Sequence, residues 1–377
     1  MLTLTGPAGL ATLPANAAGA AERIRVTNVE IHPVVVPMQD DIINSPEFSP
    51  DALSEFPTIP KFILKLHTDS GIIGIGETSR EVKESGVRRN AGAVTGANVL
   101  DLNLANLALP DRASYSGFET ALYDIVGKAF HWPVYRLLGG LAQRKVLVNY
   151  WCGRKNPVDI RRVAQRAVAG HFQGIKIKGR PGDPVVKAVA AIAEVDPRLK
   201  ITVDFNAHHK TVAEFLPIGQ GLDAIGNMLV IEDPIVKTDL AGYHELKSRL
   251  KTPLALHLGD PKQMIRAIRA DACSIFNTGP ATGMPSFVSN CYLAGAAGMP
   301  VWHGSGHELG ILDAAMLHSC AASPNCTLPS DILSYQRVDD LIVHPIEIRD
   351  SYAIVSDLPG LGIELDEDAV RRYRVKA

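Results

Sequence analysis

Polar residues able to bind metals or move protons recur at the ends of short apolar runs in the second half of the chain. In chain order they are Lys176 and Lys178, Asp204 and Asn206, Glu232 and Asp233, His257, Asn277, and His303 with His307. A single aspartate in such a place is as often a helix cap as a metal ligand. A series of amines, carboxylates and imidazoles on successive runs instead favours metal-assisted acid–base chemistry.

Lys176 and Lys178 stand two residues apart on one apolar run, Gly-Ile-Lys-Ile-Lys-Gly. In a strand, both side chains therefore leave the same face. If that face is the interior of a closed sheet, each ammonium group disfavours the charge of the other, which lowers a pKa toward the range of a general base. The alternative is a pair of solvated lysines at a frayed strand end.

Asp204 and Glu232 end two consecutive runs, KITVDFN and MLVIEDP. Hard divalent cations such as Mg²⁺ prefer carboxylate oxygens of this kind. The alternative is that both carboxylates cap the helices that follow, although Pro234 leads the chain away directly after Glu232 and Asp233. We therefore expect a divalent-metal site between these two runs.

The apolar runs alternate with amphipathic windows, which is the pattern of parallel strands joined by crossover helices. Helical windows include residues 157–169 and 184–193, and the runs are VLVNYW, GIKIKG, KITVDFN, MLVIEDP, PLALHL, ACSIFN and MPVWHG. Their number favours a closed barrel above an open sheet. In such a barrel the chemistry lies where strands end, which is where the polar residues stand.

The first part of the chain has a different pattern. Residues 23–38 and 61–79 predict antiparallel strands with a hairpin turn at Asp69-Ser70-Gly71, and residues 116–138 predict one long helix ended by two glycines. The polar segment 39–58 predicts a functional loop between two strands, or alternatively a disordered insert.

Composition limits the possible partners of the chain. Its 377 residues are 46% hydrophobic, and 38 Lys and Arg balance 40 Asp and Glu, so there is no electrostatic signature of nucleic acid or membrane binding. No stretch reaches the ~20 apolar residues of a membrane span. The five cysteines are scattered and predict neither a disulfide framework nor a zinc site. We expect a small-molecule partner.

The motifs LKITVDFN, LVIEDP and KIKG resemble the mandelate racemase and muconate lactonizing branch of the enolase superfamily. The helix GFETALYDIVGKAFHWPVYRLLGG and the tail PGLGIELDED extend the resemblance from Arg23 to the end of the chain. It implies an α/β fold, a (β/α)7β TIM-like barrel with an α+β capping domain. The implied divisions are an N-terminal capping domain at 23–143, the barrel at 144–345, and a C-terminal segment, 346–377, that returns to the capping domain.

Residues 1–22 are expected to be a signal-like or disordered extension, since they are nearly free of charge but lack a positive start. The family resemblance implies a cytoplasmic protein, and the signal-like segment leaves export open. It also implies a homo-oligomer.

The resemblance further implies a chemistry: abstraction of the proton beside a carboxylate, giving an enediolate, with Mg²⁺ as cofactor. Lys178 matches the base, Lys176 tunes it, and Asp204 and Glu232 match the first two ligands. The third ligand is expected at His257, with Asp260 as the fallback candidate, because the family's acidic position falls on Leu258. An imidazole ligand could favour Mn²⁺, Fe²⁺ or Zn²⁺; the alternative is a structural histidine.

On the opposite face of the substrate, the family's histidine position falls near Gly304 and its orienting aspartate near Ser274. His303 or His307 is therefore the candidate second acid–base group. Candidate substrate-binding residues are Asn206, Asn277, Arg180 and His208, with His209 beside it.

The tail also resembles glucarate-type acid sugar dehydratases, so dehydration of a sugar acid is the leading hypothesis for the reaction. A racemase, epimerase or cycloisomerase on the same scaffold is the second hypothesis. The third is a degenerate barrel that binds a ligand without turning it over, because the third metal ligand and the orienting aspartate depart from the family pattern.

Overall fold

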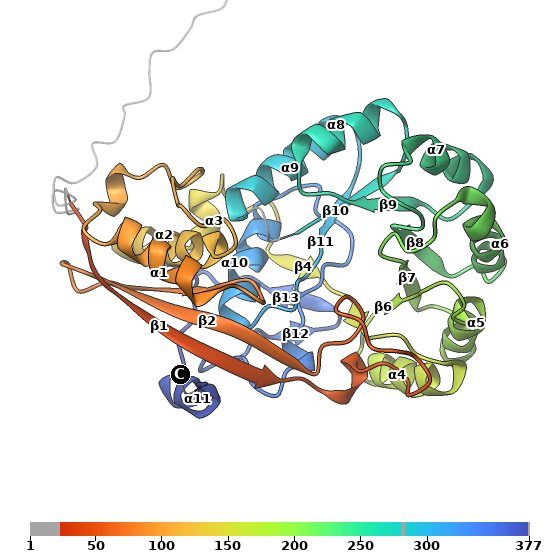
Figure 1. Ribbon diagram of the computed structural model, residues 1–377, viewed down its shortest axis with the longest axis horizontal. Coiled ribbons are helices and arrows are strands. Elements are labelled where there is room, and N and C mark those ends of the chain that lie inside the picture. The colour runs from red at the N-terminus through yellow and green to blue at the C-terminus, as the bar shows by residue number, and fades with distance from the viewer. Residues whose placement is uncertain (1–22, 280–282, 376–377) are drawn as a thin grey trace, which may run out of the picture.

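The computed structural model describes residues 23–279 and 283–375 (Figure 1). The predicted extension at 1–22 lies outside the described residues. Within them, no helix is long and apolar enough to cross a membrane.

A three-stranded antiparallel sheet and a helical layer form the capping region, on one side of the molecule in Figure 1. The strands are β1 (Val26–Pro37), β2 (Thr58–Thr68) and β3 (Ile73–Glu77), and the helices are α1 (Glu84–Val94), α2 (Tyr115–Ala129) and α3 (Val134–Leu137). The predicted hairpin turn joins β2 to β3, and Gly71 there has φ +79°. Helix α2 lies so close to β3 that a Cβ at Gly76 would be 1.9 Å from the carbonyl of Gly117.

The prediction of one helix over 116–138 is wrong in one respect. Helix α2 ends at Ala129, and α3 begins after Pro133. Proline has no backbone N–H to continue a helix, and its fixed φ suits the residue before a new one, so the chain is interrupted here.

Seven parallel strands form a curved sheet with neighbours in chain order. They are β5 (Tyr150–Trp151), β6 (Gly174–Lys178), β7 (Lys200–Asp204), β8 (Met228–Glu232), β9 (Leu254–His257), β10 (Ile275–Thr278) and β11 (Val301–His303). A helix follows each strand: α4 (Pro157–Ala169), α5 (Val185–Val195), α6 (Val212–Asp223), α7 (Leu240–Arg249), α8 (Pro261–Arg269), α9 (Met284–Ala296) and α10 (Gly310–Ala321).

The extended segment 326–331 closes the sheet. Cys326 pairs with Val301 of β11, and Ser330 pairs with Val148, two residues before β5, both in parallel. Within residues 23–279 and 283–375, the strand–helix unit therefore occurs seven times and an eighth strand-like segment follows, which is the predicted (β/α)7β barrel. A small apolar cluster of Val230, Ala255, Ile275 and Trp302 fills the barrel below the strand ends.

The C-terminal tail contacts both the barrel side and the cap of the molecule. Strands β12 (Ile348–Arg349) and β13 (Tyr352–Ile354) make a small antiparallel sheet with β4 (Lys145–Leu147). Beyond them, α11 (Glu367–Tyr373) packs against β1, where Val375 donates to the carbonyl of Pro33. Figure 1 shows α11 beside the long β1–β2 hairpin.

A buried ion pair joins the cap to the barrel. Lys61 on β2 and Glu77 on β3 lie 3.0 Å apart with both side chains fully buried. Glu77 also accepts hydrogen bonds from the backbone N–H groups of Leu309 and Leu312 at the start of α10. One carboxylate thus neutralises a buried amine of the cap and satisfies the first turn of a barrel helix.

We expect the substitution Glu77→Gln to lower the free energy of unfolding by roughly 3–5 kcal/mol, because it leaves the Lys61 ammonium buried without a counter-charge. Urea unfolding followed by circular dichroism measures this. The exposed pair Glu84–Arg88 is the matched control, and Glu84→Gln should change stability by less than about 0.5 kcal/mol. Equal losses in the two variants would contradict the assigned role of Glu77.

Candidate active site

A cavity of about 420 Å³ opens at the carboxyl ends of the barrel strands. Barrel residues that line it include Lys176, Lys178, Asp204, Asn206, Lys237, His257, Asn277, Gly304, His307 and Asp331. The cap contributes Leu53 and Phe56 from the segment after β1, and Arg80 from the segment after β3. Most of the residues that the sequence singled out at strand ends therefore share one cavity.

Lys176 and Lys178 both point into the barrel, as their spacing predicts. The Lys176 Nζ lies 2.8 Å from Asp331 and 2.9 Å from Glu232. The Lys178 Nζ donates to Asp204 at 2.5 Å and to the Asn206 amide oxygen at 3.2 Å. Each amine is thus paired with carboxylates from neighbouring strands.

The expected lowering of a lysine pKa is wrong for Lys176. Burial lowers the pKa of this ammonium, but Asp331, Glu232 and Asp204 outweigh burial and hold the pKa above its usual value. The reason is that three carboxylates surround the Lys176 ammonium, so opposite charges act on it more strongly than the neighbouring lysine does.

Asp204 and Glu232 are direct neighbours across β7 and β8. Burial opposes charge on Asp204, but Lys178 and Lys176 outweigh it and lower the pKa of that carboxyl. Burial and the charge of Asp204 raise the pKa of Glu232 to about 7. Two adjacent carboxyls with pKa values shifted in opposite directions form a site that an added positive charge would stabilise.

The donor set fits a divalent cation. Glu232, Asp233 and His257 each offer a ligand atom, and these atoms lie within 4.8 Å of one another. Burial, with Lys237 and Lys176 nearby, lowers the pKa of His257 to about 3, so its imidazole is in the neutral form that binds metals. The cluster contains Asp233 where the sequence led us to expect Asp204, whose Oδ2 instead pairs with Lys178.

The structure distinguishes the two candidates for the third ligand. His257 lies two residues beyond Ala255 on β9 and lines the cavity, while Leu258 packs into the hydrophobic core. Asp260 is the N-cap of α8 and accepts the backbone N–H of Lys262. Only His257 of these three faces the carboxylates of the site.

Asn277 occupies the space where a side chain at Gly304 would lie. A Cβ at Gly304 would be 2.3 Å from the Asn277 Oδ1. The amide of Asn277 instead reaches across the barrel and donates to Glu232 at 2.5 Å. Asn277 on β10 thus leaves no room for a histidine side chain at position 304.

The two candidate histidines of the opposite face lie on different sides of the barrel wall. His303 is fully buried, and its ring packs edge-on against Phe287 of α9 instead of lining the cavity. His307 lines the cavity, with its ring 3.8 Å from that of Phe56 and 4.6 Å from that of Trp151. Burial, with Arg80 and Lys178 nearby, holds the pKa of His307 well below its usual value, so the ring is neutral.

Arg180 and His208 do not line the cavity. The Arg180 Nη2 donates to Asp51 at 2.9 Å and thereby ties the segment 39–58 to the barrel. Arg154 acts similarly, since it pairs with Asp183 at 2.6 Å and donates to the carbonyl of Ser49. His208 is exposed and contacts the backbone carbonyls of Phe205 and Asn206 in its own turn, and the neighbouring His209 is buried, with its ring against the carbonyl of Pro234.

Three residues of the site were not expected from the sequence, and a fourth, Asp233, was named at a strand end but not as a ligand. Asp331 pairs with Lys176, Asp233 joins the metal-type cluster, Lys237 pairs with Asp233 at 2.7 Å, and Arg80 enters from the cap. Asp331 could have been found by extending the rule of strand ends to an eighth strand. Arg80 follows β3 of the cap, where that rule gives no guidance.

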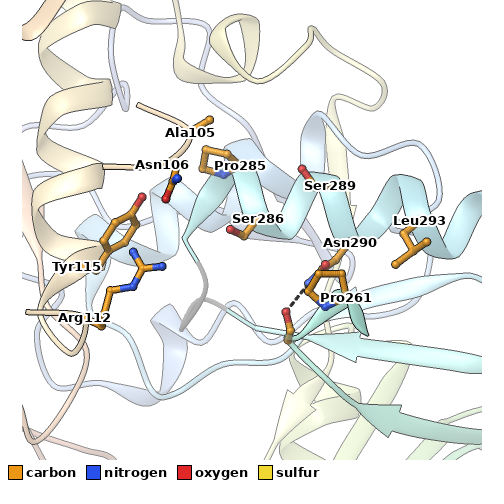
Figure 2. A pocket seen from close by; sticks show the side chains of 11 residues that line it. Ala105, Asn106, Arg112, Tyr115, Pro261, Pro285, Ser286, Ser289, Asn290 and Leu293 are labelled. Atoms are coloured by element: carbon orange, nitrogen blue, oxygen red, sulfur yellow. Dashed lines mark hydrogen bonds between the residues drawn. The ribbon is translucent and has the colours of Figure 1, made fainter. Parts of the chain in front are cut away.

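A second cavity of about 380 Å³ lies between the cap segment Ala105–Tyr115 and helices α8 and α9. Figure 2 shows Arg112 and Tyr115 of the cap facing Ser286 of α9, with Asn290 donating to a backbone carbonyl. Among the described residues that line it there is neither a carboxylate nor a histidine. This cavity therefore lacks the groups for metal-assisted acid–base chemistry.

Comparison with known proteins gives one family. Residues 159–369 match the family model described as enolase C-terminal domain-like. The chain is 30% identical to N-succinylamino acid racemase of Thermus thermophilus over 67% of this chain and 69% of that protein. It is 29% identical to o-succinylbenzoate synthase of Bacillus subtilis, covering 71% and 72% of the two chains.

Two further similarities complete the comparison. D-galactonate dehydratase of Variovorax paradoxus is 27% identical over 81% of this chain and 89% of that protein. Muconate cycloisomerase of Pseudomonas fluorescens has the same fold, with a TM-score of 0.81 over 93% of this chain and 99% of that chain at 21% identity. The relatives therefore share a scaffold and carry names of several different reactions.

The Asp51–Arg180 contact predicts how the attachment of the segment 39–58 to the barrel depends on pH. Burial opposes charge on Asp51, but Ser54 and Arg180 outweigh it and lower its pKa to about 2. A pKa below the usual 3.8 means that the contact is at full strength above pH ~4 and is lost as pH falls through ~2. We expect Asp51→Asn to weaken the attachment already at pH 7.

Cleavage by chymotrypsin after Phe48, which lies under Arg154, measures this attachment. Asp51→Asn should be cut several-fold faster than the parent protein, whereas Asp40→Asn, an exposed change in the same segment, should be cut at the parental rate. Equal cleavage rates in all three proteins would contradict the role of the Asp51–Arg180 contact in holding the segment 39–58 against the barrel.

Proposed function

Because this chain belongs to the enolase superfamily, in its mandelate racemase and muconate lactonizing branch, we propose that Lys178 removes the proton beside the carboxylate of a sugar acid and that water is then eliminated. The observation that best supports this proposal is that Lys178, Asp204 and His257 line one cavity, while the Glu232 carboxylate is buried beside Asp204 on the neighbouring strand. Proton abstraction beside a carboxylate is the chemistry of the superfamily, whereas the sugar acid and the loss of water are specific to this proposal.

The chain's own residues account for the first step. A proton beside a carboxylate is weakly acidic, because its removal places negative charge on oxygens that are already anionic. In its neutral amine form, Lys178 accepts the proton at Nζ and becomes an ammonium group that Asp204 neutralises, while Asn206 orients the amine. Lys176, held by Asp331 and Glu232, keeps a second ammonium group beside the developing charge. Fixed charges aimed at such a position stabilise the transition state more than the substrate.

We propose that Glu232, His257 and Asp233 hold a divalent cation, with Asp204, which also pairs with Lys178, as a fourth donor. Mg²⁺ suits the carboxylates, and the imidazole of His257 also admits Mn²⁺. When bound, such a cation supplies electrophilic stabilisation to the carboxylate oxygens of the substrate.

Elimination of water follows from the same geometry. Once Lys178 carries the abstracted proton, it can return that proton to a hydroxyl leaving on the same face. His307, which lies beside the same Trp151 ring as Lys178, is neutral and can orient the hydroxyl by a hydrogen bond, but it is rarely an imidazolium that could deliver a proton. A single protonated base is enough for this route, and the similarity to D-galactonate dehydratase favours it.

Racemisation or epimerisation is the second candidate, favoured by the similarity to N-succinylamino acid racemase. It needs proton-transfer groups on both faces of the substrate. Lys178 as an ammonium and His307 as a neutral imidazole would form such a pair. Product mass separates the two candidates, because racemisation conserves the mass of the substrate and dehydration removes one water. A member that only binds ligand would show neither reaction.

The change Lys178→Met tests the base. With Mg²⁺ or Mn²⁺ and a panel of sugar acids in D₂O, we expect the parent protein to place deuterium beside the carboxylate or to release water, as read by mass spectrometry. The variant should lose roughly 10²- to 10⁴-fold in rate, the usual contribution of a general base. Lys247→Met on the surface of α7 should keep the parental rate, and unchanged exchange in Lys178→Met would refute the assignment.

Calorimetric titration with Mn²⁺ tests the cation site without relying on turnover. Glu232→Gln and His257→Ala each remove a proposed ligand, so affinity should fall by more than the ~10- to 100-fold that loss of an outer-shell partner costs. Asp260→Asn is the matched control and should bind Mn²⁺ like the parent, because Asp260 caps α8. If Asp260→Asn weakened binding and His257→Ala did not, the ligand assignment would be reversed.

A further inference from the structure

Arg80 brings to the cavity a cation that has no counter-charge among the described residues. Lys176 pairs with Asp331 and Glu232, Lys178 with Asp204, and Lys237 with Asp233. Arg80, in contrast, has no carboxylate within ion-pair distance among residues 23–279 and 283–375. Glu81 and Glu308 act on it only from a greater distance.

The Arg80 guanidinium is held in place even without a carboxylate. Its Nε donates to the carbonyl of Gly306 at 2.6 Å, and its Cζ lies 4.2 Å from the centre of the Phe56 ring. Because Nε is used in this way, the edge formed by the two terminal nitrogens remains for a ligand. That edge matches the two oxygens of a carboxylate.

Arg80 and Lys178 stand at the two ends of one aromatic row. Arg80 lies over Phe56, Phe56 contacts His307, His307 contacts Trp151, and Lys178 lies 5.7 Å from the centre of the Trp151 ring. A further cavity of about 250 Å³ shares Arg80, His257 and residues 304–306 with the main one, so the space continues past the guanidinium. A substrate whose reacting carboxylate lies near Asp204 and Glu232 can therefore extend along this wall to Arg80.

We propose that Arg80 binds a second carboxylate at the far end of the substrate, so that the substrate class is a dicarboxylic acid. This inference rests on the proposed function, because it places the first carboxylate at the proposed cation site. For a sugar acid it means a diacid, with carboxylates at both ends of the carbon chain. An N-succinylamino acid has the same chemistry at its succinyl end.

Matched substrates test the inference. Galactarate and galactonate have the same carbon chain and hydroxyl configuration and differ only in whether the far end is a carboxylate or a hydroxymethyl group. We expect the parent protein to prefer the diacid by roughly 10- to 100-fold in kcat/KM, the usual value of hydrogen bonds to a charged group. An N-succinylamino acid and its N-butanoyl analogue form a second matched pair, which identifies the source of the distal carboxylate.

The change Arg80→Gln should remove this preference, mainly by raising KM for the diacid, because the contact binds substrate and transition state alike. The monoacid should be little affected. Arg80→Lys should be intermediate, since it keeps the charge but loses the planar fork. Arg112→Gln is the matched control: it removes a cap arginine that faces the second cavity (Figure 2), and it should leave the preference unchanged.

Two results would overturn the inference. One is equal kcat/KM for diacid and monoacid in both pairs with the parent protein. The other is a loss in Arg80→Gln that is the same for both members of each pair, which would indicate general damage to the cavity. Absence of exchange with every substrate would instead count against the proposed function. Calorimetric binding of galactarate would then decide the role of Arg80, with weaker binding by Arg80→Gln supporting it and equal binding overturning it.

Discussion

The mutual neutralisation of lysines and carboxylates inside the barrel mouth is the interaction on which the rest of the site depends. Charges taken out of water are costly unless each has a partner at short range. Here Lys176 lies between Glu232 and Asp331, and Lys178 lies against Asp204. The partners come from β6, β7, β8 and the closing segment 326–331. A slip of one residue in any of these strands would turn its charged side chain into the helical layer and leave the others unpaired.

The sequence was sufficient for this part of the site because strand ends follow a simple rule. Alternating runs and windows predicted the barrel, and the positions of Lys176, Lys178, Asp204 and Glu232 followed from which face of a strand each side chain leaves. Asp331 was missed because the segment 326–331 is joined to its neighbours by isolated bridges and has no apolar run of its own. The sequence has seven apolar runs of this kind, whereas a closed barrel needs an eighth strand.

Other residues could not be placed from the sequence, for reasons of distance or direction. Arg180 stands two residues past Lys178 and so resembled a substrate ligand, but Asp51 attracts it from a loop that is 129 residues away in the chain. His303 and Gly304 differ by one position, and only the pleat of β11 decides that Gly304 faces the cavity. The pKa of Lys176 depends on three carboxylates that lie on separate segments.

The barrel and the cap each contribute side chains to the cavity, and separate contacts hold the two sets in place. The barrel supplies the amines and carboxylates, whose positions are fixed by neighbouring strands. The cap supplies Leu53, Phe56 and Arg80, whose positions depend on Arg154, Arg180 and the Gly306 carbonyl. Glu77 anchors the cap to the first turn of α10, three residues after His307. Substitutions on the cap side can therefore change the lining of the cavity while the buried charges of the barrel stay paired.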